Sequence, residues 1–381
     1  MPIPKNFIPK NRPTNGRWAV LIIAAFLFLL HFLFLPSPAL SQESGINHSV
    51  PLVTDFPVPK RLKLCNEPMP LEDRWVWEML DRELTIAAWD RAQVFMWLKR
   101  AGRYFPYLEK RLREEGMPGD LKYLAVAESS LLTHIRSSKG AIGPWQFMPR
   151  TARRHGLRKD RRMDERRDFE RATDAALRYL KKLKKTFGSW TMAMAAYNCG
   201  EARMKQEIRA QKEKSYYQLN LPNETERFIY RIAAIKLIME NPETYGYRVP
   251  KEKIYRPVQY DSVRIRVRVP IHLADFAKAL GTNLKAIKDL NPQILGYHLP
   301  TGTYTLKTPP GTGRQVKQVL VRLARQTPSP GKVSGKYYIV RNGDTLSRIS
   351  RKTGVPVSAL QALNGIDGSL IRVGQRLRIS H

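Results

Sequence analysis

The 381-residue chain contains few cysteines and few acidic residues. Only two cysteines occur, Cys65 and Cys199, far apart and without clustered histidines. Such a pair does not supply a structural zinc ligand set, so we expect no metal and no cofactor. In an oxidising compartment the two thiols would form a disulfide, and two buried free thiols are the alternative.

Acidic residues number 33 against 66 lysines and arginines, which gives a formal net charge of +33. A surplus of this size indicates an anionic partner, and nucleic acid, anionic lipid and acidic cell-wall polymer all fit it. Hydrophobic residues make up 43% of the chain, which is normal for a globular protein and argues against extensive disorder. Charge alone does not choose among these partners.

Long apolar runs are also scarce, and the one that occurs extends from Ala19 to Leu35. Basic residues precede it, and small residues at Ala39 and Ser41 follow, as in a signal peptide with its cleavage site. Its length also approaches that of an uncleaved membrane anchor, and a buried core helix is a third alternative. We expect residues 1–41 to be a signal peptide or N-terminal membrane anchor. The rest would then be exported to the periplasm or cell envelope, which argues against nucleic acid as the partner.

The remaining chain divides into a helical part and a mixed part. Residues 42–70 are rich in proline and serine and are interpreted as a linker. Residues 71–245 have helical patterns throughout, including an amphipathic stretch around Leu180 with lysines on its other side. Asn223 and Glu226 have the spacing of a capping box at a helix start. The expected fold class is therefore mainly α.

Two stretches beyond residue 250 match each other at a constant offset. Leu273 matches Leu346 and Asn291 matches Asn364, and both pairs differ by 73 positions (346 − 273 = 73). Such a repeat indicates two copies of one small module. Each copy has the pattern of a strand, two helices and a strand, and residues 311–335 between them are predicted to be a linker.

The second copy, residues 336–381, resembles a LysM domain through "YIVRNGDTLSRIS" and "IRVGQRLRI". The resemblance implies a βααβ fold that binds glycan containing N-acetylglucosamine. The glycan-binding residues that it implies are Asp344, Thr345, Asn364 and Ile366. Without the resemblance, Asp344 is a helix cap and Asn364 a turn residue. The first copy, residues 260–310, lacks the Gly-Asp-Thr start, so we expect a degenerate LysM-like module that packs against the helical part or acts as a spacer.

One carboxylate lies on the apolar face of a predicted helix. Glu128 follows Leu124 by one helical turn in "LKYLAVAESS". A structural carboxylate at such a place would pair with Arg or Lys, whereas a catalytic one often has no such partner and a raised pKa. No second carboxylate is evident in the neighbouring motifs, because Glu115 and Asp120 precede the helix in a turn that looks exposed.

Three ordered motifs surround this residue: "ESSLLTHIRSSKGAIGPWQFMPRTA", "AYNCG" and "LPNET". They resemble the motifs of lytic murein transglycosylases with the soluble-lytic-transglycosylase, lysozyme-like fold. The resemblance implies an all-helical catalytic domain over residues 71–245 with Glu128 as its acid and base. The substrate-binding residues that it implies are Ser137, Gly143, Gln146, Met148, Tyr197 and Asn198. Cys199 replaces the alanine more usual in this family, and a bridge to Cys65 would tie the early segment to the active-site wall.

A single acid suits a substrate that assists its own cleavage. In murein, the N-acetyl group of MurNAc can stabilise C1 while the C6 hydroxyl attacks it, which gives a 1,6-anhydro sugar without water. Neutral Glu128 would donate a proton to the glycosidic oxygen and then take one from the C6 hydroxyl. We therefore expect a peptidoglycan lytic transglycosylase held on glycan strands by LysM. A muramidase hydrolysing the same bond and a non-catalytic wall-binding scaffold are the alternatives.

Overall fold

The computed structural model describes residues 55–326 and 337–379. The predicted signal peptide or anchor, residues 1–41, lies outside these ranges, as does the first part of the predicted linker. Within the described ranges, no helix combines the length and the apolar character needed to cross a membrane. The buried hydrophobic side chains of these ranges form three cores, one in the helical part and one in each of the two repeated modules.

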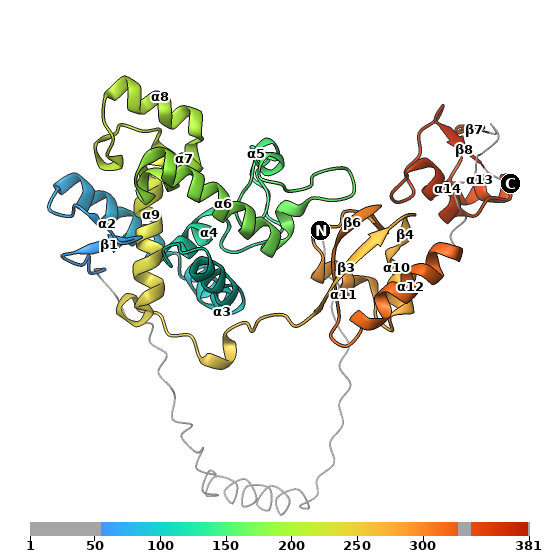
Figure 1. Cartoon of the computed structure of the whole chain (residues 1–381), viewed down its shortest axis with the longest axis horizontal. Coiled ribbons are helices and arrows are strands. Elements are labelled where there is room, and N and C mark those ends of the chain that lie inside the picture. The colour runs from blue at the N-terminus through green and yellow to red at the C-terminus, as the bar shows by residue number, and fades with distance from the viewer. Residues whose placement is uncertain (1–54, 327–336, 380–381) are drawn as a thin grey trace, which may run out of the picture. The chain divides into compact units, whose positions relative to one another are not determined.

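The helical part confirms the predicted mainly α class. Its central helix, α9, contacts α2, α4 and α7 and lies between α2 and α4 (Figure 1). Most of its side chains are buried, as a helix surrounded by other helices requires. The α-helices of the helical part are α2 (Arg74–Trp89), α3 (Arg91–Glu114), α4 (Leu121–Ser129), α5 (Pro149–Arg154), α6 (Phe169–Phe187), α7 (Trp190–Cys199), α8 (Glu201–Gln211) and α9 (Asn223–Glu240). Short 3-10 helices are η1 (Glu165–Arg167), η2 (Tyr216–Gln218), η3 (Pro242–Tyr245) and η4 (Lys251–Lys253).

The capping box predicted at the start of α9 is wrong. Asn223 is the first residue of the helix rather than its cap. Pro222 occupies the N-cap position, and no side chain caps the helix. Glu224 and Glu226 instead place negative charge in the first turn, where the helix dipole favours it.

Residues 55–70 differ from the linker that composition indicated. β1 (Leu62–Leu64) and β2 (Glu67–Met69) form an antiparallel hairpin whose apolar side chains join the helical core. The carboxylate of Glu67 accepts hydrogen bonds from the backbone N–H groups of Trp190 and Thr191 at 2.6 and 3.0 Å. The hairpin therefore fixes the start of α7, a contact with a distant segment that composition does not reveal.

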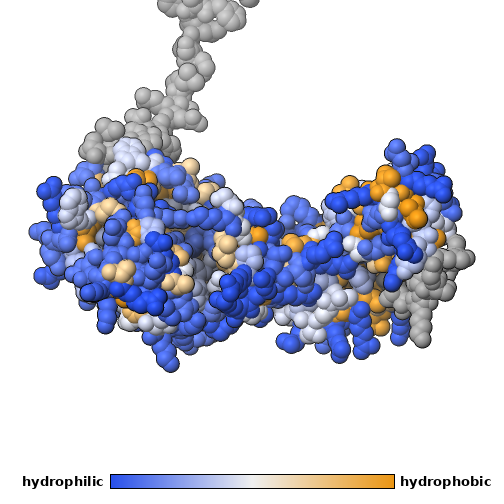
Figure 2. All heavy atoms as spheres, turned by 90° about the horizontal axis from the view of Figure 1, so that it is seen from above, coloured by the Kyte–Doolittle hydropathy of each residue, from blue (hydrophilic) through white to orange (hydrophobic). Residues whose placement is uncertain are grey.

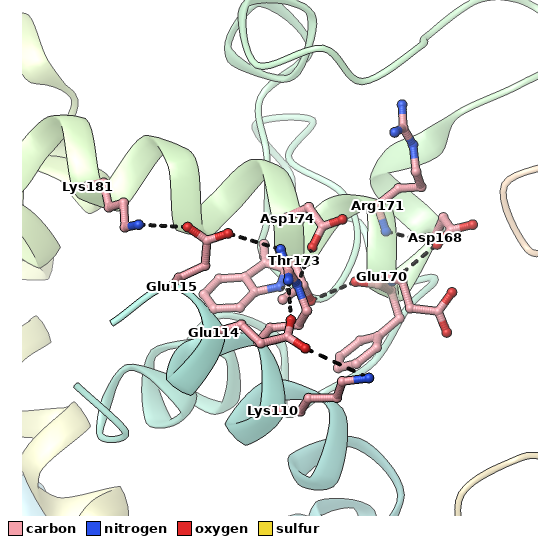
Figure 3. Close-up of polar contacts among 12 residues, drawn as sticks. Lys110, Glu114, Glu115, Asp168, Glu170, Arg171, Thr173, Asp174 and Lys181 are labelled. Atoms are coloured by element: carbon pink, nitrogen blue, oxygen red, sulfur yellow. Dashed lines mark hydrogen bonds and ion pairs between the residues drawn. The ribbon is translucent and has the colours of Figure 1, made fainter. Parts of the chain in front are cut away.

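An ion-pair network joins α3 to α6 on the surface (Figure 3). The Arg111 guanidinium lies 2.9 Å from Asp174 and 3.1 Å from Glu115. Glu115 also accepts a hydrogen bond from Lys181 at 2.6 Å. Partly exposed ion pairs of this kind contribute about 1 kcal/mol or less each, so the network adds only modestly to the packing of α3 on α6.

The two repeated modules contain the predicted strand–helix–helix–strand units. In the first, β3 pairs with β6; in the second, β7 pairs with β8; both pairs are antiparallel. The first module comprises β3 (Asp261–Val267), β4 (Ile271–His272), α10 (Leu273–Ala279), α11 (Leu284–Leu290), β5 (His298–Leu299) and β6 (Gly302–Thr308). The second comprises β7 (Tyr337–Ile339), α13 (Leu346–Thr353), α14 (Val357–Asn364) and β8 (Arg376–Arg378).

The repeat extends to individual hydrogen bonds. The Asn291 side chain donates to the carbonyl of Lys307 at 2.6 Å and accepts from its N–H at 3.0 Å. At the matching position, Asn364 donates to the carbonyl of Arg378 at 3.0 Å and accepts from its N–H at 2.6 Å. In both copies one asparagine thus ties the end of the second helix to the last strand.

The range 311–335, predicted to be a linker, contains an additional helix. α12 (Gly313–Gln326) buries Val316, Val319 and Leu320 in the core of the first module and contacts β3. The expected packing of this module against the helical part is present, because Met163 forms a β-bridge with Ile294. On the face drawn in Figure 2, hydrophilic residues predominate and hydrophobic ones form scattered patches.

Candidate active site

A pocket in the helical part brings the three sequence motifs together. Its volume is about 510 Å³, and polar atoms line most of it. The residues that line it and bear on the chemistry are Glu128, Ser137, Lys139, Gln146, Met148, Tyr179, Tyr197, Asn198, Glu224 and Arg231. They come from α4, the loop before α5, α6, α7 and α9, so the pocket exists only once these helices have packed.

Glu128 lies one residue before the end of α4, which stops where Ser130 adopts a left-handed conformation with φ of 53°. Its side chain is partly buried, and its carboxyl group makes no hydrogen bond or ion pair with any residue that the structure describes. Desolvation, helped by the negative charge of Glu224, raises the pKa of the Glu128 carboxyl to about 8, although Arg231 acts to lower it. The group is therefore mainly protonated at neutral pH, as a proton donor must be.

The expectation that no second carboxylate lies nearby is wrong. Glu224, in the first turn of α9, lines the same pocket as Glu128. Its side chain is 65% exposed and lies 3.5 Å from Lys139. The residue stands in the quoted "LPNET" motif, but only folding brings that motif to Glu128. The two carboxyl groups have different surroundings, since one is desolvated and unpaired while the other is solvated and paired with a cation.

Tyr197 from α7 lies beside Glu128, as the resemblance implied. Its hydroxyl donates a hydrogen bond to the carbonyl oxygen of Trp145 at 2.7 Å. Burial raises the pKa of Tyr197, and the nearby Glu128 charge raises it further, so the phenol remains neutral. The Trp145 ring is fully buried in the helical core.

Two of the other motif residues are bonded within the loop before α5, and a third is bonded to α9. The Ser137 hydroxyl accepts from the Ala141 N–H at 3.0 Å rather than bonding to Glu128. The Gln146 amide donates to the Gly143 carbonyl at 2.8 Å, and Asn198 accepts from the Thr225 hydroxyl at 2.8 Å. Ser137, Gln146 and Asn198 nevertheless line the pocket. A fourth pocket residue, Met148, is 43% exposed, so it is not a core side chain.

Gly143 does not line the pocket. A glycine is required there because the backbone lies close to Arg166. With φ of +88°, it lies so close to Arg166 that an added Cβ would stand 1.8 Å from the Arg166 carbonyl oxygen. The Arg166 side chain is buried and bonded to Asp164, and it donates to the carbonyls of Gly140 at 3.1 Å and Phe147 at 2.8 Å. Arg166 thus holds the loop before α5. Sequence reasoning missed it, because it stands in a basic run that resembles a solvated face.

The disulfide considered for the two cysteines is not formed, and both are free. Cys65 is buried in the turn between β1 and β2, and its N–H donates to Asp120 at 2.7 Å. Cys199 ends α7 and lines the pocket. Burial raises the pKa of both thiols, which therefore stay protonated. Across residues 55–326 and 337–379, no group of three or more His, Cys, Asp and Glu side chains is placed to hold a metal ion.

The LysM residues implied by the resemblance have structural roles in the second module. Asp344 accepts from the Tyr338 hydroxyl at 2.8 Å and from the Arg341 N–H at 3.0 Å, and these bonds lower the pKa of its carboxyl to about 2. The helix cap is Thr345 rather than Asp344, because the Thr345 hydroxyl accepts from the N–H of Arg348. Asn364 is bonded to the last strand as described above, and Ile366 is buried in the core of the module.

Two parts of the chain match known families. Residues 106–220 match the Transglycosylase SLT domain, and residues 338–380 match the LysM domain. The chain contains an SLT domain and a LysM domain. Glu128 and the first two motifs lie inside the SLT match, and Glu224 lies just beyond it.

A curated relative matches most of the chain. The chain is 31% identical over 296 residues to "Membrane-bound lytic murein transglycosylase D" of Escherichia coli strain K12; the match spans 74% of this chain and 64% of that protein. The chain is also 54% identical over 41 residues to "Autolysin" of Enterococcus faecalis, which is 11% of this chain and 6% of that protein.

Solved structures of two lytic transglycosylases match part of the chain. The 70 kDa soluble lytic transglycosylase of Escherichia coli is 20% identical, with a TM-score of 0.31 over 40% of this chain and 27% of that one. The Slt lytic transglycosylase of Pseudomonas aeruginosa is 19% identical, with a TM-score of 0.30 over 40% of this chain and 26% of that one.

Proposed function

We propose that this protein is a peptidoglycan lytic transglycosylase that cleaves the bond between MurNAc and GlcNAc and forms 1,6-anhydroMurNAc. One observation carries the proposal: the Glu128 carboxyl lines the SLT-domain pocket without a bonding partner among the described residues, and its pKa is raised to about 8. A protonated carboxyl group facing a polar pocket can donate its proton to a glycosidic oxygen.

The reaction needs two proton transfers, and Glu128 performs both. It first protonates the leaving GlcNAc oxygen as the bond to C1 of MurNAc breaks. The carboxylate formed then accepts the proton of the MurNAc C6 hydroxyl as that oxygen attacks C1. Arg231, which lowers the pKa of Glu128, stabilises the carboxylate between the two transfers. The enzyme is thereby restored and no water is consumed.

The remaining pocket residues position the glycan strand. Gln146, Met148 and Asn198 line the pocket around Glu128 and would contact the sugar rings. Ser137 and Tyr197 have hydroxyl groups already bonded to the backbone, so they shape the pocket walls. Gly143 allows the loop before α5 to lie close to Arg166. We propose these roles in place of the uniform substrate-binding set that the family resemblance implied.

The domain organisation follows from the same proposal. Residues 71–245, together with the hairpin before them, would form the catalytic domain. Residues 336–381 would hold the enzyme on glycan through LysM, with the Asp344, Thr345, Asn364 and Ile366 region near the sugar. Residues 1–41 would export the protein to the cell envelope or anchor it in the membrane. Peptidoglycan is then the anionic partner that the charge of +33 indicated.

A muramidase is the second candidate, and the position of Glu224 favours it. An inverting hydrolase uses a second carboxylate as the base that activates water. Glu224 is exposed and forms an ion pair with Lys139 at 3.5 Å. The lytic reaction requires no such base, so the products separate the two candidates.

The experiment is a digestion of purified sacculi by the full chain, followed by mass spectrometry of the released muropeptides. Anhydromuropeptides are expected from the wild type and from Glu224→Gln. No product is expected from Glu128→Gln, although that variant should still sediment with sacculi. Glu243→Gln, which removes an exposed carboxylate paired with Arg248, is the matched control and should remain active. Reducing MurNAc ends that disappear in Glu224→Gln would establish hydrolysis instead. An inactive wild type that still sediments would indicate a wall-binding scaffold.

A further inference from the structure

A groove in the first repeated module lies between a strand and a helix. One wall is the run 264–269 with Ile271, and the other is α12, through Lys317, Leu320 and Ala324 among others. α12 follows β6 and packs beside β3 (Figure 1). The groove has a volume of about 750 Å³ and is lined mainly by apolar atoms. α12 is not part of the βααβ unit that the two modules share, so the groove is specific to the first module.

The strand wall of the groove has a free backbone edge. β3 pairs with β6 along one side, from Asp261 opposite Thr308 to Val267 opposite Gly302. In an antiparallel pair, alternate residues direct N–H and C=O groups away from the partner strand. Among the described residues, no other backbone segment hydrogen-bonds to the run 262–269. The groove therefore contains unpaired donors and acceptors in the regular spacing of a strand.

The rim of the groove is strongly basic. Five cationic residues and no acidic residue line it, and none of the five forms an ion pair with a described residue: Arg264, Arg266, Arg268, Lys317 and Arg325. All five are exposed. Elsewhere basic side chains often have acidic partners, as Arg111 has Asp174 and Lys307 has Glu170. Unpaired cations gathered around one groove favour an occupant that carries negative charge.

We propose that this groove binds an extended acidic peptide segment of another protein, which adds as a further strand to the free edge of β3. Backbone hydrogen bonds to β3 would supply affinity, as in other complexes formed by strand addition. Apolar side chains of the peptide would contact Leu320, Val321 and Ala324, and its acidic side chains would meet the arginines. The proposal is independent of the glycan reaction, whose pocket lies in the SLT domain.

The geometry favours a peptide over a membrane surface. Of the large hydrophobic side chains that line the groove, only Val321 is strongly exposed, at 53%. Binding by insertion into lipid would need a broader exposed apolar face. A groove with a free strand edge on one side instead suits a single extended chain, which can pair with that edge through its backbone.

The test uses the full chain and a fluorescein-labelled peptide of about seven residues that alternates glutamate with valine. Binding is followed by fluorescence anisotropy, and hydrogen exchange of residues 262–268 is followed by mass spectrometry. We expect saturable binding with slower exchange in β3. A peptide with lysine in place of glutamate should bind at least about tenfold more weakly. The acidic peptide with alternate amides N-methylated should bind equally weakly, because it cannot complete the strand bonds.

Variants locate the site. Arg264→Glu combined with Arg266→Glu should weaken binding by about tenfold or more and should leave murein digestion unchanged. Arg322→Glu is the matched control, since Arg322 is exposed on α12 but does not line the groove. Equal binding of the N-methylated peptide, or unchanged exchange in β3, would overturn strand addition. Absence of peptide binding would mean that the arginines only keep the strand edge soluble. Saturable binding to vesicles containing phosphatidylglycerol in place of the peptide would also overturn the proposal, because it would identify a lipid surface.

Discussion

The hydroxyl of Tyr197 donates its hydrogen bond to the backbone carbonyl oxygen of Trp145, 2.7 Å away. Tyr197 belongs to α7, and Trp145 belongs to the loop that carries Gln146 and Met148. This bond joins two walls of the pocket. The phenol proton is engaged in this hydrogen bond and is not donated to Glu128. Tyr197 therefore affects Glu128 by holding the pocket walls in place.

Tyr197→Phe should therefore destabilise the fold and lower the activity moderately. Loss of the hydroxyl leaves the Trp145 carbonyl without its partner, which costs about 1 to 2 kcal/mol. Urea unfolding of the full chain measures the free energy. Tyr179→Phe is the matched control, because Tyr179 lines the same pocket and its hydroxyl makes no hydrogen bond with a described residue. Equal losses in the two variants would contradict this role of the Tyr197 hydroxyl.

The activity should decrease as pH rises through about 8, because the reaction begins with protonated Glu128. Glu224→Gln removes the negative charge that raises the pKa of Glu128, so the decrease should begin at lower pH. Arg231→Gln removes the positive charge that lowers this pKa, so the decrease should begin at higher pH. The measurement is kcat/KM on soluble glycan chains as a function of pH. Shifts in the same direction in both variants would contradict the electrostatic account.

Glu128→Gln should increase stability in a manner that depends on pH. In the folded protein the carboxyl holds its proton up to about pH 8, whereas the unfolded chain releases it near 4.5. Between these values the folded state binds more protons, so wild-type stability falls as pH rises. The substitution removes this dependence, and its stabilising effect should grow from about pH 4.5 to 8 and then level off. Urea unfolding at several pH values tests this; a constant difference would show that the carboxyl titrates alike in both states.

Gly143→Ala and Gly140→Ala form a matched pair. Both glycines have positive φ, +88° and +87°, but only at Gly143 would a Cβ meet another atom, the Arg166 carbonyl oxygen. Gly140→Ala should cost about 1 to 2 kcal/mol, the cost of a left-handed residue with a side chain. Gly143→Ala should cost at least about 3 kcal/mol, because the loop must move away from Arg166. Thermal unfolding measures both, and similar losses would mean that the backbone yields easily at Arg166.

Local patterns were sufficient for much of this molecule. The position of Glu128 on the apolar face of a helix is a matter of residue spacing, and the structure places it on α4 as predicted. The repeat is also evident in the sequence, and the structure confirms it, since Asn291 and Asn364 make equivalent bonds. Such features depend on residues close in sequence or on the similarity of two segments, so the amino-acid sequence is enough to predict them. The mainly helical class followed from the same periodicity.

The tertiary structure decided which distant groups meet. Glu224 joins Glu128 only because α9 packs against α4, so the second carboxyl group could not be recognised from spacing. The role of Gly143 likewise depends on Arg166, which the sequence places in a basic run that resembles solvated surface. Composition predicts linkers where the hairpin at residues 62–69 and the helix α12 stand, because composition does not reveal whether a short apolar face will pack on a core. Burial and charge pairing depend on how the whole chain packs. Packing therefore sets the pKa of Glu128, and it leaves the cations beside β3 without an acidic partner among the described residues.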